Sequence, residues 1–197
     1  MAWVDAQQMA RHGLGAPRCA ARIWVDPRAC HDVVVGGLDV GRRRSGRVVG
    51  GDWAVAQISR IEKLRMAEEH WGHGLSWEEV GAYEYMRQRL AELGSRDGVR
   101  SMDDIVRRYA HLDEIFEVVR REGRLRSRSE LPGPSHRETN GVYMHIGRDG
   151  SPVFGNGGCH RLAMARVLEL RLIPAQLGMV HPDALSTWRA LRSPDHG

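Results

Sequence analysis

The sequence predicts an α+β protein, in which a helical region precedes a compact segment of short strands around one buried helix. Three patterns support this prediction. Apolar residues recur every three or four positions from Met102 to Val119, as they do on the buried face of a long helix. Residues 142–146 and 151–154 are typical of two short strands joined by a turn. Residues 162–170 are apolar on nearly every side, so we expect a largely buried helix there.

The first half of the chain gives shorter signals. We expect residues 1–50 to be irregular apart from short strands at 23–25 and 33–35, each followed by turn residues. Apolar residues at 58, 61 and 64 would share one face of a first helix. A second helix is expected to open at Ser76 and to end at a glycine.

The long helix has its own start and stop signals. Ser101 is expected to cap its first turn, and Gly123 is expected to end it. Beyond the buried helix, residues 172–180 indicate another strand and residues 184–191 a short closing helix.

The composition is that of an ordinary globular protein with a modest positive charge. The chain has 197 residues and a formal charge of +4. Nearly all its cations are arginines, which suit phosphate and carboxylate groups. A GC-rich coding sequence produces the same bias, and a dedicated nucleic-acid binder would concentrate its charge more strongly. We expect the run Arg42-Arg43-Arg44 to lie in a solvated loop.

Cysteine usage and hydropathy indicate a cytoplasmic protein. Cys19, Cys30 and Cys159 are odd in number and irregularly spaced, so they match neither a disulfide framework nor a zinc signature. The first residues lack the regions of a signal peptide, and no apolar run is long enough to span a membrane. We therefore expect no membrane partner.

One motif carries chemistry. A strand is followed by a glycine-rich turn and then a helix, in the segment Phe154-Gly155-Asn156-Gly157-Gly158-Cys159-His160-Arg161. Glycines allow tight or left-handed backbone and let a ligand approach the main chain closely. The first N–H groups of the helix have no partner within it and, with the helix dipole, favour an anion. The turn therefore predicts a phosphate-binding site.

Cys159 is the best candidate nucleophile of the chain, because a thiol at a helix N-terminus tends toward a depressed pKa. The alternative is that Cys159 is only a small residue in a tight corner. His160 and Arg161 would add charge-assisted hydrogen bonds to a bound anion, or they would instead cap carbonyls or pair with acids such as Glu138 or Asp149.

The motif resembles the ParB/sulfiredoxin superfamily. Sulfiredoxins carry a Phe-Gly-Gly-Cys-His-Arg turn, a helix, and then Ile-Pro-Ala and a strand, which is similar to residues 154–161 followed by Ile173-Pro174-Ala175. The resemblance covers residues 110–181, and the turn differs by the inserted Asn156. It implies a ParB/sulfiredoxin-like domain at 101–197, with residues 1–100 as an N-terminal extension that is first irregular and then helical.

The resemblance also implies a ligand. In this superfamily the turn binds nucleotide phosphates, which belong to ATP in sulfiredoxin and in a free-serine kinase and to CTP in partition proteins. By position, the cofactor-binding residues would be Gly155, Asn156, Gly157, Gly158, His160 and Arg161. Cys159 matches the catalytic cysteine of sulfiredoxins.

Three functions follow as hypotheses. The first is an enzyme that binds ATP or another nucleoside triphosphate with Mg²⁺ and moves the terminal phosphoryl group to a small molecule or an oxidised protein thiol. Cys159, His160 and Asp149 would be its catalytic residues, with Asp149 or Glu138 as base or metal ligand. The second is a non-catalytic nucleic-acid-binding or regulatory module. The third is a thiol-based redox protein that uses no nucleotide.

Overall fold

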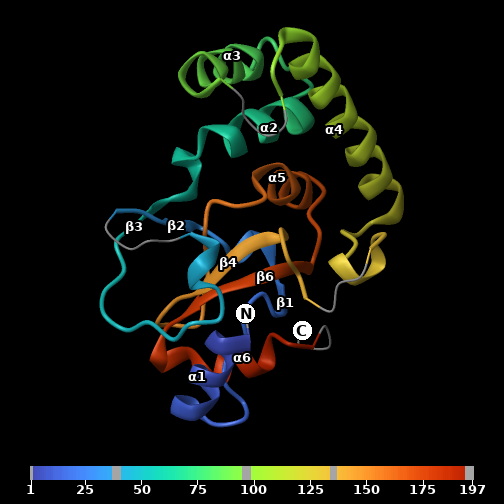
Figure 1. Cartoon of the computed structure of the whole chain (residues 1–197). Coiled ribbons are helices and arrows are strands. Elements are labelled where there is room, and N and C mark those ends of the chain that lie inside the picture. Colours follow the sequence, from blue (N-terminus) through green and yellow to red (C-terminus); the bar gives the residue numbers. More distant parts are fainter. Residues whose placement is uncertain (1, 37–40, 95–98, 134–136, 194–197) are drawn as a thin grey trace.

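The computed structural model describes residues 2–36, 41–94, 99–133 and 137–193 (Figure 1). The described strands form one mixed sheet in the order β1-β6-β4-β5-β2-β3. The strands are β1 (Arg22–Val25), β2 (Asp32–Val34), β3 (Val55–Gln57), β4 (Val142–Ile146), β5 (Pro152–Phe154) and β6 (Ile173–Val180). The predicted α+β class is confirmed.

The sheet combines strands from both halves of the chain. At its centre, β4 pairs parallel with β6 and antiparallel with β5. The early strand β1 then pairs with β6, and β2 pairs with β5 and carries β3 at the other edge. The three early strands thus cover edges of β5 and β6 that would otherwise expose unpaired backbone groups. Residues 1–100 therefore supply part of the sheet itself.

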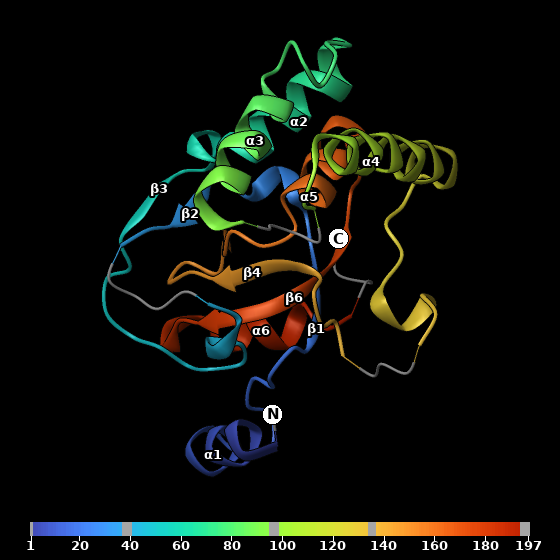
Figure 2. The same ribbon diagram turned by 45° about the horizontal axis from the view of Figure 1, so that its top comes forward.

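Helices lie on both sides of the sheet (Figures 1 and 2). On one side α5 lies nearest the strands, with α2, α3 and α4 beyond it, and on the other side lie α1 and α6. The helices are α1 (Ala2–His12), α2 (Glu62–His73), α3 (Ala82–Leu93), α4 (Met102–Glu122), α5 (Cys159–Val167) and α6 (Leu185–Ala190).

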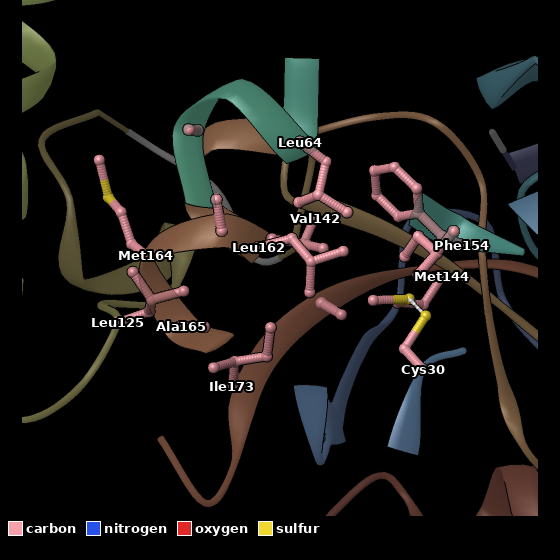
Figure 3. Packing of buried hydrophobic residues seen from close by; sticks show 14 of the residues in the cluster. Cys30, Leu64, Leu125, Val142, Met144, Phe154, Leu162, Met164, Ala165 and Ile173 are labelled. Carbon is pink, nitrogen blue, oxygen red and sulfur yellow. Dashed lines mark hydrogen bonds between the residues drawn. The ribbon is translucent and has the colours of Figure 1, made fainter. Parts of the chain in front are cut away.

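Helix α5 is the centre of the hydrophobic core. Its residues 162–165 are fully buried, as the all-round apolar pattern predicts. Leu162 packs among Val142 and Met144 of β4 and Leu64 of α2 (Figure 3). Each such side chain contributes roughly 1.5–3 kcal/mol when it leaves water, so the position of α5 against β4 is strongly fixed.

The long helix α4 begins and ends where the sequence predicts. The Ser101 hydroxyl accepts a hydrogen bond from the Asp104 N–H at 3.2 Å, and the Asp104 carboxylate accepts one from the Ser101 N–H at 3.1 Å. Gly123 ends the helix in the left-handed region at φ +63°. Helix α4 thereby holds one continuous face toward α5 and α3.

Two local expectations are wrong. Ser76 and Glu79 form their capping interaction, but Gly81 at φ +78° interrupts the chain, and the helix begins only at Ala82. The first residues are helical rather than irregular. Helix α1 buries Asp5 and Gln8 instead of an apolar stripe, so its sequence lacks the expected periodicity.

No helix among the described ranges is long and apolar enough to cross a membrane.

Candidate functional site

The glycine-rich turn connects β5 to α5 and is hydrogen-bonded to β4. The Gly155 N–H donates to the Tyr143 carbonyl, and the Tyr143 N–H donates to the Gly157 carbonyl, both at 2.8 Å. Asn156 and Gly158 have φ values of +57° and +84°. Gly158 precedes α5 without a side-chain cap, so the first N–H groups of this helix face the turn.

Close packing explains the three glycines. A Cβ atom on Gly155 would overlap the Tyr143 ring, and one on Gly158 would lie 2.9 Å from the Val142 Cα. A Cβ on Gly157 would lie 2.7 Å from the Arg42 guanidinium. Gly155 and Gly158 are therefore required by the neighbouring strand whether or not a phosphate binds, whereas a side chain at Gly157 would displace the flexible Arg42.

Two arginines meet beside this turn. Arg161, in the first turn of α5, donates to the Asn140 carbonyl. Arg42 donates to the Gln176 side chain and, at 3.1 Å, to the Gly141 carbonyl. Its guanidinium also lies 5.4 Å from the centre of the Tyr143 ring. Both cations are thus held in place by neutral acceptors.

The pKa values of both guanidinium groups are lowered. Burial and the nearby charge of Arg42 lower the pKa of Arg161, and burial lowers the pKa of Arg42. Neither forms an ion pair with a carboxylate of the described residues. Glu138 offsets the charge of Arg161 only at longer range. Like charges held together in a partly buried place favour an anionic ligand between them.

A cleft of about 690 Å³ opens in front of the turn. Ligand sites in proteins commonly measure roughly 300–1,000 Å³, so the size is suitable. One wall is Arg42 with residues 156–161, and the other comes from α2, α3, α4 and the residues before α2. The second wall consists of Arg60, Ile61, Glu62, Lys63, Tyr85, Arg89, Arg108, Leu112 and Ile115.

His160 lines the cleft and also contacts the aromatic residues of the helical layer. Its ring lies 6.4 Å from that of Trp77 and 6.0 Å from that of Tyr109, edge-on in both cases. The ring is thus oriented by packing. Of the predicted site residues, the structure brings Asn156, Gly157, Gly158, Cys159, His160 and Arg161 together around the cleft, with Gly155 buried directly behind them.

Cys159 is the thiol that faces the cleft. It is partly exposed, and its Sγ lies 3.8 Å from the Asn156 side-chain oxygen. Cys30 is fully buried against Met144, and burial raises the pKa of its thiol to about 12 (Figure 3). A thiol with so high a pKa is a poor nucleophile.

The structure does not bring Asp149 to the turn. Asp149 lies in the β4–β5 hairpin, at the opposite end of β5, where the Ser151 N–H and hydroxyl donate to it and lower its pKa. It lines a separate hollow, which shares no residue with the cleft. Asp149 and Cys159 thus lie beyond the two ends of β5 and do not line a common cleft.

Glu138 does not line the cleft among the residues that the structure describes there. It is buried, accepts from the Arg128 N–H at 3.0 Å, and has a pKa raised mainly by that burial. Its charge acts on Arg161 at longer range and partly offsets the effect of burial on the pKa of that arginine.

Most of the cationic groups that line the cleft give no local signal in the sequence. The expectation that Arg42 lies in a solvated loop is wrong, because the side chain turns inward onto Tyr143 and Gln176. Lys63, Arg89 and Arg108 come from three different helices. The run of arginines at 42–44 is the single local feature of the sequence that draws attention to one of these cations, Arg42. The other cations are scattered in a chain that is rich in arginine throughout.

Comparison of the chain with protein-family models, with curated proteins and with solved structures found no match.

A buried histidine behind the turn makes the fold sensitive to acid. His145 of β4 is fully buried, and burial lowers its pKa to about 4. Its Nδ1 accepts from the Met179 N–H at 2.8 Å, so the neutral ring carries its proton on Nε2. That proton has no acceptor among the described residues.

The unfolded chain therefore binds a proton at His145 more readily than the folded chain does. The contribution of neutral His145 to the free energy of unfolding is therefore fully present above pH 6.5. It is lost as the pH falls toward 4, and the total loss is about 3 kcal/mol. Urea unfolding of the wild type and of His145→Gln between pH 4 and 7 would measure this loss. The variant should lose most of the pH dependence, whereas a matched change of the exposed His73 to Gln should retain it. Equal slopes in all three proteins would contradict the assignment.

Proposed function

We propose that the cleft binds a nucleoside triphosphate, with ATP as the first candidate, and transfers its terminal phosphoryl group to a small molecule or an oxidised protein thiol. The observation that carries the proposal is the joint position of Arg42 and Arg161 at the uncapped start of α5. Two guanidinium groups and a helix N-terminus provide donors and positive potential at one point, which suits phosphate oxygens.

The charge of the whole cleft supports a polyphosphate. Among the residues that the structure describes, six arginine or lysine side chains and a single carboxylate, Glu62, line it. Such an excess of one sign in a concave surface raises the local concentration of anions. A ligand with several negative charges would relieve the repulsion between the cations.

The cleft also has an apolar part. Leu112 and Ile115 of α4, Ile61 and Met164 of α5 line it together with the cations. A ligand that joins a polyphosphate to a flat, largely apolar ring matches this combination better than phosphate alone does. We therefore favour a nucleotide over inorganic polyphosphate.

Mg²⁺ would enter with the nucleotide. Within the described ranges, no group of three or more His, Cys, Asp or Glu side chains is arranged to hold a metal ion. Mg²⁺ in phosphoryl-transfer enzymes is commonly bound through substrate phosphates and one or two carboxylates, and keeps several waters. Glu62 fits this requirement as a cleft carboxylate. When bound, Mg²⁺ would neutralise charge on the phosphates.

The residues of the chain would act mainly by positioning. Arg42 and Arg161 would hold the transferred group and stabilise the charge that develops on it, with the α5 N–H groups. An acceptor oxygen would bond to the terminal phosphorus while the bond to the bridging oxygen breaks, leaving the nucleoside diphosphate with the electron pair. A hydroxyl acceptor would release its proton to solvent or to His160, which lines the same cleft.

The nearest alternative is a nucleic-acid-binding module, which the number of cleft arginines also favours. Salt separates the two. Binding through several backbone phosphates weakens by about a thousandfold or more between 50 mM and 200 mM salt. A pocket for one nucleotide should change far less. A steep salt dependence with no preference for free nucleotide would favour the alternative.

Protection of Cys159 from alkylation tests the proposed site directly. Cys159 lines the cleft, whereas Cys19 is also partly exposed but does not line it. We expect saturating ATP to slow the reaction of Cys159 with iodoacetamide, as followed by mass spectrometry of peptides, and to leave Cys19 unchanged. Equal rates at Cys159 with and without nucleotide would contradict binding in this cleft.

A further inference from the structure

The helical wall of the cleft carries a cationic group that is separate from the turn. It consists of Lys63 of α2, Arg89 of α3 and Arg108 of α4, which we call the helical cations. The turn cations Arg42 and Arg161 are anchored on the carbonyls of residues 140 and 141 instead. The two groups thus face one cleft from different elements.

Two of the helical cations lie over the aromatic ring of Tyr85. The Arg89 guanidinium lies 5.4 Å and the Lys63 ammonium 5.7 Å from the centre of its ring. A cation over an aromatic ring is attracted by the ring's negative face. The ring therefore offsets part of the repulsion and keeps two charged heads near each other at the cleft.

The third helical cation, Arg108, lines the same cleft from α4. It shares one face of α4 with Leu112 and Ile115, at spacings of four and seven residues, and this face lines the cleft. The side chain is partly buried, so its charge is less screened than that of a surface arginine.

The acidic partner of Arg89 is a weak competitor for a ligand. Arg89 pairs with Glu92 at 2.9 Å, but both side chains are about half exposed. Exposed pairs of this kind contribute about 1 kcal/mol or less, so an anion in the cleft could replace Glu92. Glu62 is the single carboxylate among the lining residues that the structure describes.

We propose that the helical cations form a second anion subsite, which binds a phosphate or carboxylate group of the phosphoryl acceptor while the nucleotide occupies the turn. The inference rests on the proposed function. It narrows the acceptor to a small hydroxyl compound that carries such a group. Arginine side chains suit this role because their donors match both kinds of oxyanion.

The test is a titration of the full chain saturated with the non-hydrolysable analogue adenylyl imidodiphosphate. Inorganic phosphate and succinate are the probes, and calorimetry is the measurement. We expect at least one probe to bind the saturated protein. The double variant Arg89→Gln/Arg108→Gln should weaken the probe about tenfold or more and the nucleotide analogue by less than about threefold. The double variant Arg87→Gln/Arg107→Gln is the matched control, since both arginines are exposed partners of acids on the same helices.

Three outcomes would overturn the inference. The first is that neither probe binds the saturated protein. The second is that the control variant weakens the probe as strongly as the test variant does. The third is that the test variant weakens the analogue as much as loss of Arg161 does, which would assign the helical cations to the nucleotide itself. If the analogue fails to bind at all, the proposed function fails. In that case the probe can still be titrated into the free protein. If it binds there and the binding depends on Arg89 and Arg108, the anion subsite is supported even though the proposed function is not. Thermal unfolding of each variant confirms that it is folded.

Discussion

Arg161→Ala is expected to weaken nucleotide binding by about a hundredfold or more, because it removes a partly buried cation from the centre of the anion site. The ligand phosphate would lose its charge-assisted hydrogen bonds, while Arg42 alone would remain on the other side of the turn. Calorimetric titration with ATP measures the change. Arg161→Lys, which keeps the charge but not the forked donors, should lie between the wild type and the alanine variant.

The ligand-free Arg161→Ala variant should remain folded. Burial and the repulsion from Arg42, which lower the pKa of Arg161, are costs of the wild-type site that the variant relieves, while it loses the hydrogen bond to the Asn140 carbonyl. Arg148→Ala is the matched control. Arg148 lines the separate hollow beside Asp149, so its loss removes one charge without touching the cleft. Equal affinity in the Arg161→Ala variant and the wild type would contradict the assigned site.

Gly155→Ala is expected to destabilise the fold by about 2–3 kcal/mol, although it adds a single methyl group. That methyl group would overlap the Tyr143 ring and lie 2.8 Å from Nε2 of His145, both of which are fully or nearly fully buried. Neither ring can move freely, because Tyr143 and His145 are packed against each other with ring centres 4.9 Å apart. Urea denaturation measures the loss.

Gly72→Ala gives the corresponding control. Gly72 lies inside α2, and a Cβ there would meet only the Val167 side chain, at 3.7 Å. Because alanine favours a helix more than glycine does, we expect this variant to be unchanged or to gain about 0.5–1 kcal/mol. Similar stabilities of the Gly155→Ala and Gly72→Ala variants would show that the close packing behind the turn does not hold.

The sequence predicts elements that depend on local signals. The start of α4 follows from Ser101 and Asp104, which satisfy the backbone of their own helix turn. The β5–α5 turn follows from three glycines between an apolar strand and an apolar helix. Helix α1 gives no such signal, because its buried positions Asp5 and Gln8 are polar and bond to distant segments.

The sequence predicts only those residues of the candidate site that lie next to one another in the chain. Arg161 and His160 follow the turn directly, so the motif indicates them. Arg42 contacts Tyr143 and Gln176, which are register partners on β4 and β6, so its place in the site depends on the pairing of strands that are distant in the sequence. The composition cannot distinguish it from other arginines. Asp149 is close to the turn in sequence, but the length of β5 separates it from Cys159 in the structure.

Direct calorimetric titration of the full chain with ATP, CTP and GTP in the presence of Mg²⁺ tests the central claim. The account predicts that one of these nucleotides binds with a dissociation constant on the order of 1–100 μM, which corresponds to a favourable binding free energy of roughly 5.5–8 kcal/mol. Binding should remain when the salt is raised from 50 mM to 200 mM, as for a pocket that holds one nucleotide. Absence of heat and of binding for all three nucleotides would contradict the proposal that this cleft is a nucleotide site.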